Sequence, residues 1–132
     1  MPSCRRYLCL AALSAFTGVA FGAFGAHGLR DVLDSYHLSV YKTGVEYQMW
    51  HALGLGLIAT WMRSDPESPR LLWAARLMFF GILVFSGSLY LLSLTGIRWF
   101  GAITPFGGMA FLVSWLLLAI HSCKSTLSDQ DA

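Results

Sequence analysis

Long apolar runs alternate with short groups of charged residues along this chain. Four segments contain no Asp, Glu, Lys or Arg, namely residues 7–29, 47–62, 77–97 and 99–123. A helix needs about 20 apolar residues to cross roughly 30 Å of hydrocarbon. The second segment is short, but its helix can start earlier, near Ser39 or Gly44, with Lys42 and Glu46 in the headgroup layer. The pattern therefore predicts four transmembrane helices.

The polar segments between these runs set the expected helix ends. RSDPESPR at 63–70 contains two prolines and four charges, which is typical of a short hairpin. Thr104 and Pro105 fit an N-cap and a first helical position. We expect an all-α fold, an integral membrane four-helix bundle forming a single domain over 1–132. Its helices are expected at approximately 7–29, 39–62, 71–94 and 104–122, followed by a polar tail at 123–132.

The connection between the first two predicted helices is amphipathic. In DVLDSYHLSVYKT, residues 31–43, apolar side chains recur at helical spacing and the polar ones face away. Such a segment is typical of a short helix that lies in the headgroup plane. We expect a connector between two spans rather than a binding helix.

Composition supports a membrane location and charge gives an orientation. Hydrophobic residues make up 56% of the chain and charged residues 12%. The net charge of +2 comes from scattered residues, which argues against a nucleic-acid partner. Six of the nine Lys and Arg fall on the side that would hold both termini. This bias places both termini in the cytoplasm, or in the matrix if the membrane is mitochondrial, and the compact loops favour a multi-pass protein of a bacterial inner membrane.

A cleaved signal peptide is the main alternative for the first helix. Arg5 and Arg6, an apolar core and the small residues of FGAFGA resemble its three-part pattern. The apolar run continues to Leu29, however, which is longer than the usual core of about 7–15 residues. We therefore expect a retained transmembrane helix.

Small residues concentrate on one side of the first helix. Gly18, Gly22, Gly25 and Gly28 fall within about a third of its circumference. Gly87, Gly107 and Gly108 offer similar small surfaces on the later helices. Such surfaces let helix backbones approach closely. They indicate either close packing inside one compact bundle or a seam for self-dimerisation.

Four blocks of the sequence resemble one family of small membrane proteins. They are GAFGAHGL, YKTGVEYQMWHAL, FSGSLYLLSLTG and TPFGGMAFLVSW, and the likeness extends over residues 8–120. The family is the YgdD-type family of unknown function, which is similar to the transmembrane protein 256 family. The resemblance implies a four-helix inner-membrane protein and brings no substrate, cofactor or catalytic residue.

A few polar residues could carry chemistry near the membrane. His27, Tyr47, Gln48 and His51 are expected at similar depth in the first two helices, where they could form one polar cluster. The cluster could lock the helices together, conduct protons or cations, or bind a metal. Lys42 and Glu46 are expected to form an interfacial ion pair.

Two classes of function remain open at this point. We find no catalytic motif, no CxxC or HxxxH pair of metal ligands and no cofactor motif in the sequence, so an enzyme is not expected. The first hypothesis is a non-catalytic component that packs against other membrane helices as a partner, assembly or stability factor. The second is a small carrier or channel for a proton, a cation or a small solute, which would work as a homo-oligomer. No broken helix or pair of buried carboxylates marks a transport site, which favours the first.

Overall fold

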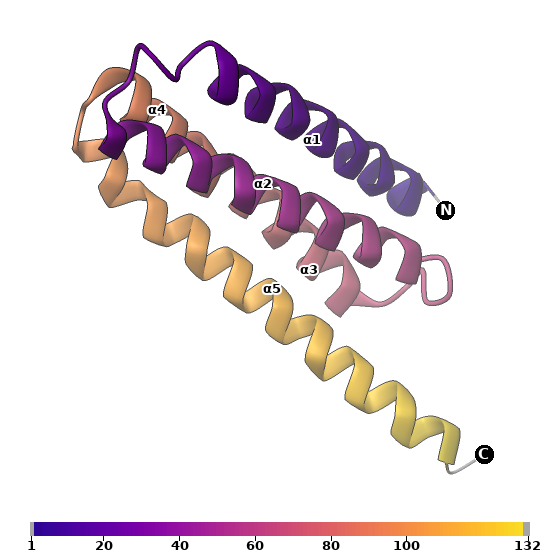
Figure 1. Ribbon diagram of the computed structural model, residues 1–132. Helices are drawn as coiled ribbons and strands as arrows, with labels where there is room; N and C mark the ends of the chain where they lie inside the picture. The colour runs from indigo at the N-terminus through magenta and orange to yellow at the C-terminus, as the bar shows by residue number, and fades with distance from the viewer. Residues whose placement is uncertain (1, 131–132) are drawn as a thin grey trace.

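The computed structural model describes the backbone of residues 2–130 and the side chains of residues 3–123. The helices are α1 (Pro2–His27), α2 (Ser35–Trp61), α3 (Pro69–Gly81), the π-helical segment η1 (Ile82–Ser86), α4 (Gly87–Thr95) and α5 (Trp99–Gln130). Because α3, η1 and α4 follow one another without a break, residues 2–130 form four helical rods. Figure 1 shows α1 beside α2, with the α3–η1–α4 rod behind α2 and α5. The predicted all-α, four-helix fold is confirmed.

Three of the four rods are long and apolar enough to cross a membrane. These segments are Ser3–His27, Pro69–Thr95 and Trp99–Cys123. The helix α2 has 27 residues, but its composition is less apolar. It contacts α1, α3, η1 and α4, so much of its surface faces protein rather than lipid. A helix in that position can carry polar side chains that a lipid-facing helix could not.

The predicted interfacial helix at 31–43 is not confirmed. The structure begins α2 at Ser35, so most of that segment forms the first two turns of α2. Asp34 is the N-cap, and its carboxylate accepts a hydrogen bond of 2.9 Å from the backbone N–H of His37. This bond and a second one from the His37 ring hold the pKa of Asp34 below its usual range. The hydroxyl of Tyr41 donates to a backbone carbonyl of α1, which keeps the start of α2 against the bundle.

The last helix begins earlier than predicted. Helix α5 starts at Trp99, and Pro105 lies inside it instead of at its first position. The Thr104 hydroxyl does not cap the helix, because it lies 2.7 Å from the Ser88 hydroxyl of α4 and also bonds the Phe100 carbonyl. Neighbouring helices and hydroxyl side chains of this kind make proline tolerable inside a membrane helix. The side chains of the predicted polar tail after Cys123 lie outside the described residues.

The third predicted helix contains a change of helical type. The sequence predicts one helix over 71–94, whereas the structure has five residues of π-helix, Ile82–Ser86, within that range. The rod ends at Gly96, which has φ +71° and closes the helix in the left-handed conformation that favours glycine. A π segment holds an extra residue in a turn and so changes which side chains face each neighbour.

The largest group of buried apolar side chains lies toward the end of the bundle that holds the α2–α3 hairpin. Leu55, Ile58, Leu71 and Met78 are completely buried there. Toward the other end the helices approach through smaller contacts, in which a glycine of one helix receives a side chain of the next. The two ends of the bundle therefore use different packing.

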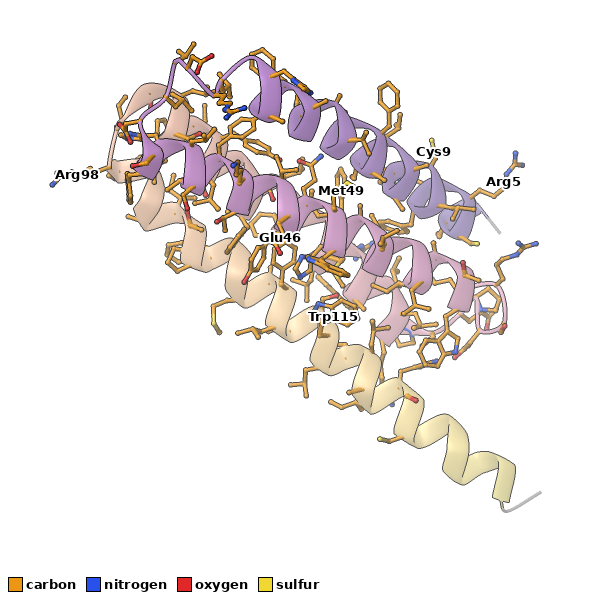
Figure 2. All side chains as sticks on the ribbon, in the orientation of Figure 1. Arg5, Cys9, Glu46, Met49, Arg98 and Trp115 are labelled. Carbon is orange, nitrogen blue, oxygen red and sulfur yellow. The ribbon has the colours of Figure 1, made fainter. Side chains whose placement is uncertain are left out.

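The glycine stripe of α1 is covered by α2. A Cβ atom built at these glycines would come within 3.3 Å of an α2 side chain, with the pairs Gly18–Met49, Gly22–Val45 and Gly25–Tyr41. Figure 2 shows Met49 on the side of α2 that faces α1. The compact-bundle interpretation is therefore supported over a dimerisation seam, because the stripe is not free to meet a second copy.

The remaining predicted packing glycines differ from one another. Gly28 lies past the end of α1 and faces Phe24 of the same helix, so it joins no two helices. Gly107 is the tightest position, because an added Cβ would come within 2.5 Å of the Phe85 backbone nitrogen. Gly108 has ordinary room beside the Phe85 ring, and an added Cβ at Gly87 would meet nothing within 4 Å. Among the described residues, no neighbouring helix therefore packs against Gly87.

We predict that Gly107→Ala destabilises the bundle by about 1–3 kcal/mol, because the methyl group would force the α5 and η1 backbones apart. The matched control is Gly87→Ala, whose methyl group enters open space and should be neutral or stabilise the helix by up to about 1 kcal/mol. Unfolding of both variants in mixed micelles, followed by circular dichroism, measures the difference. Equal stabilities would contradict the close contact at Gly107.

Candidate functional site

Gln48 is the centre of a polar network in the middle of the bundle. Its Nε2 atom donates to the Ser14 carbonyl and to the Thr17 hydroxyl of α1, both at 2.8 Å. Its Oε1 atom accepts a hydrogen bond of 2.7 Å from the Tyr90 hydroxyl of α4. The Gln48 side chain is buried, so one amide joins three helices and uses both of its ends.

His51 lies one turn further along α2 and faces α5. Its Nδ1 donates to the Tyr47 carbonyl at 2.7 Å, because a carbonyl can only accept. Its ring stacks on Phe111, with the ring centres 3.5 Å apart and the planes 14° apart. The Tyr47 ring stacks on Phe85 of η1 and on His51 itself. His51 is thus part of an aromatic stack between α2, η1 and α5.

His27 does not join the predicted cluster. It is exposed at the end of α1, whereas Gln48 and His51 are buried. Gly25, two residues before His27, faces Tyr41 of α2. Gln48 lies seven residues after Tyr41, and α2 runs antiparallel to α1, so Gln48 is about 10 Å along the bundle axis from the level of Gly25. The prediction placed His27 at the same depth because it began α2 at Ser39. The earlier start moves Gln48 and His51 deeper into the bundle.

The predicted Lys42–Glu46 ion pair is not formed. Both side chains are exposed, and the ion pairs among residues 3–123 are Asp34–His37 and Asp65–His121. In a helix, an acidic residue four positions before a basic one is the more favourable order. Lys42 precedes Glu46, so the attraction that would hold this pair is weak.

Sequence reasoning missed the partners of Gln48. Ser14, Thr17 and Tyr90 lie on other helices, and their sequence separation from Gln48 gives no sign of contact. Tyr90 was visible as a polar side chain within an apolar segment, which is costly in a membrane unless the hydroxyl finds a partner. The identity of that partner depends on the packing of α4 against α2.

A second polar group at the hairpin end of the bundle was also missed. His121 of α5 is buried, its Nδ1 is 3.4 Å from the Ser68 hydroxyl, and its Nε2 is 3.9 Å from an Asp65 oxygen. The Trp61 ring packs against it edge to face. A nucleophilic triad needs a short hydrogen bond from an accessible serine to Nε2. Here Ser68 is buried and its hydroxyl contacts Nδ1 of His121 instead of Nε2. The contacts of His121 with Ser68 and Asp65 therefore hold α5 against the α2–α3 hairpin.

Buried polar atoms are fully paired in the part of the chain that the structure describes. Among residues 3–123, every buried side-chain nitrogen or oxygen has a hydrogen-bond partner. In the same range, no three His, Cys, Asp or Glu side chains are grouped closely enough to hold a metal ion. The buried polar groups therefore bond one another, the backbone of neighbouring helices, as Ser86 and Ser114 do, or the backbone of their own helix, as His51 and Ser93 do.

The chain is similar to a group of bacterial membrane proteins. Residues 21–108 match a family described as "Protein of unknown function (DUF423)". A UPF0382 membrane protein of Staphylococcus saprophyticus is 50% identical over 118 residues, which cover 89% of this chain and 97% of the relative. The UPF0382 membrane protein YwdK of Bacillus subtilis is 45% identical over 118 residues, covering 89% of this chain and 96% of YwdK. No solved structure matches the chain.

We predict that the Gln48–Tyr90 hydrogen bond contributes about 1 kcal/mol of coupling energy. Interhelical hydrogen bonds in membranes average about 0.6 kcal/mol and reach about 1.7. A double-mutant cycle with Gln48→Leu and Tyr90→Phe, measured as the free energy of unfolding in mixed micelles, gives the value.

The matched control for this cycle is Tyr36→Phe, because Tyr36 is exposed at the start of α2. Its replacement should leave the stability of either single variant unchanged. If the two substitutions at Gln48 and Tyr90 are strictly additive, the Gln48–Tyr90 hydrogen bond contributes no net stability.

Proposed function

We propose that the chain, an integral membrane protein that belongs to the DUF423 family, works by packing its helices against another membrane protein. In this proposal it is a non-catalytic partner, assembly or stability component. The observation that carries the proposal is the complete pairing of buried polar atoms among residues 3–123. A substrate site or an ion pathway needs polar groups that can turn to the passing molecule, and these groups are already held by neighbouring helices or by the backbone of their own helix.

The contact with a partner must lie outside the glycine stripe, because α2 covers that stripe. A shallow groove of about 350 Å³ runs between the outer sides of α1 and α2. Ala12 and Ala15 line it from α1, and Leu53, Gly56 and Thr60 line it from α2. Small side chains at this spacing let the backbone of another helix approach closely, which favours a transmembrane helix of the partner as the occupant.

The orientation and location are part of the same proposal. We infer that α2 is the fourth membrane-spanning helix, since it runs antiparallel to α1 and lies between α1 and the α3–η1–α4 rod (Figure 1). Four crossings put both termini on one side, and the excess of Lys and Arg favours the cytoplasm of a bacterial cell. The four quoted blocks further support an equivalence with the YgdD-type family.

We predict that the two ends of α2 lie on opposite sides of the membrane. Asp31→Cys and Glu67→Cys, each exposed in a connection and introduced into a chain whose own cysteines are replaced by alanine, report on those ends. An impermeant maleimide added to intact cells should label position 31 and not position 67. Labelling of both positions from the same side would show that α2 does not cross.

We also predict that a defined membrane protein co-purifies with the tagged chain in mild detergent. Gly56→Leu should reduce the recovery of this partner at least about tenfold, because the new side chain fills the groove. The bundle itself should tolerate the change, because a Cβ atom added at Gly56 would meet only Ala11, at 3.8 Å. The control is Ala102→Leu, because Ala102 is an exposed residue of α5, and this change should leave the recovery of the partner unchanged. Absence of a partner, together with proton or cation flux in liposomes that is lost in His51→Phe, would support the carrier hypothesis instead.

A further inference from the structure

A second groove opens between α1 and α3 at the hairpin end of the bundle. It has a volume of about 390 Å³. Helix α1 packs on α2 and hardly touches α3, so the two helices form separate walls. Tyr7 and Leu72 lie between those walls, and Leu10, Phe80 and Leu83 extend the groove toward the middle of the bundle. The groove is therefore open to the lipid along its side.

Two arginines face this groove from opposite walls. Arg6 comes from α1 and Arg76 from α3, and both line the groove. The Arg76 guanidinium lies 5.1 Å from the centre of the Trp73 ring, which helps to hold it in place. Neither arginine belongs to the ion pairs formed among residues 3–123. The mouth of the groove is therefore positively charged, and no carboxylate lies among the described residues that line it.

The groove continues along the same two rods. A narrower hollow of about 220 Å³ shares Leu83 with it and extends past Gly87 to Phe21 and Tyr90. Ser14, Thr17 and Gln48 also line this hollow, and the Gln48 amide is hydrogen-bonded to the Thr17 hydroxyl. An added Cβ at Gly87 would meet nothing within 4 Å, so the space beside this glycine is open. Arg76 and Gly87 are separated by eleven residues, or about 16 Å along the helix. This length is close to half of the roughly 30 Å of hydrocarbon in a bilayer, which is the depth of one leaflet.

We propose that the groove between α1 and the α3–η1–α4 rod, together with the hollow that continues it, binds one anionic phospholipid, with the lipid phosphate between Arg6 and Arg76. The surface lined by Leu10, Leu83 and Gly87 receives one of its acyl chains. Guanidinium groups bind phosphate oxygens through paired hydrogen bonds, and two of them suit a lipid with a negative headgroup. Basic pockets between transmembrane helices recognise such headgroups.

The position of the arginines agrees with a lipid in its own leaflet. Arg6 lies one turn inside the start of α1, and Arg76 lies about two turns inside the start of α3. Long arginine side chains at these depths reach back to the level of the phosphates. The apolar part of the groove then runs inward from that level, in the direction that an acyl chain takes. Headgroup and chain are therefore recognised by two different parts of one groove.

The test uses the purified full chain in vesicles made of equal parts of phosphatidylglycerol and phosphatidylcholine. After mild extraction, native mass spectrometry counts the lipids that stay bound. We expect phosphatidylglycerol to be retained over phosphatidylcholine, and Arg6→Gln or Arg76→Gln to lower that preference about fivefold each. Gly87→Leu, which fills the acyl part of the groove, should remove the retained lipid. Inorganic phosphate at millimolar concentration should not replace it.

The matched control is Arg5→Gln, since Arg5 carries the same charge on the neighbouring position and points away from the bundle (Figure 2). It should leave the preference unchanged. An equal loss in Arg5→Gln and Arg6→Gln would replace the site by diffuse surface attraction. Equal retention of the two lipids, or unchanged retention in a folded Gly87→Leu variant, would overturn the proposal. The arginine variants decide the matter even if Gly87→Leu does not fold.

Discussion

The amide of Gln48 joins α1, α2 and α4 at a depth where water cannot replace a missing partner. Its two ends are used by the Ser14 carbonyl, the Thr17 hydroxyl and the Tyr90 hydroxyl. A polar group left unpaired in the interior of such a bundle would cost several kcal/mol. This requirement fixes the relative height and rotation of the three helices. The other contacts of the bundle have to be compatible with that arrangement.

Close approach of the backbones follows from the same requirement. Serine hydroxyls reach carbonyls of neighbouring helices, as Ser86 does with Gly44 and Ser114 with Ala74, each at 2.7 Å. The acceptor carbonyls belong to small residues, Gly44 and Ala74. The glycines of α1 likewise let its backbone approach the side chains of α2 closely. The stripe of glycines that resembled a dimerisation seam is therefore used within the molecule.

These internal contacts leave different surfaces for other molecules. Two sides of α1 border grooves, one shared with α2 and lined by small apolar residues, the other shared with α3 and bearing Arg6 and Arg76. The first suits the backbone of another helix, and the second suits a charged headgroup with its acyl chain. Arg5 and Arg98 project from the two ends of the bundle, away from both grooves (Figure 2). A helix partner and an anionic lipid could therefore bind at the same time.

The sequence by itself determined the class of this protein, because the lengths of its apolar runs match the thickness of a bilayer. It also located the hairpin at 63–70 and the polar residues Gln48 and His51 on the second helix. It could not give the start of α2, because capping by Asp34 and anchoring by Tyr41 depend on a bond to α1. Nor could it show that Gln48 pairs with Tyr90, or that His27 lies apart from Gln48 and His51. Those choices depend on which helix faces which and at what height, and only packing in three dimensions decides them.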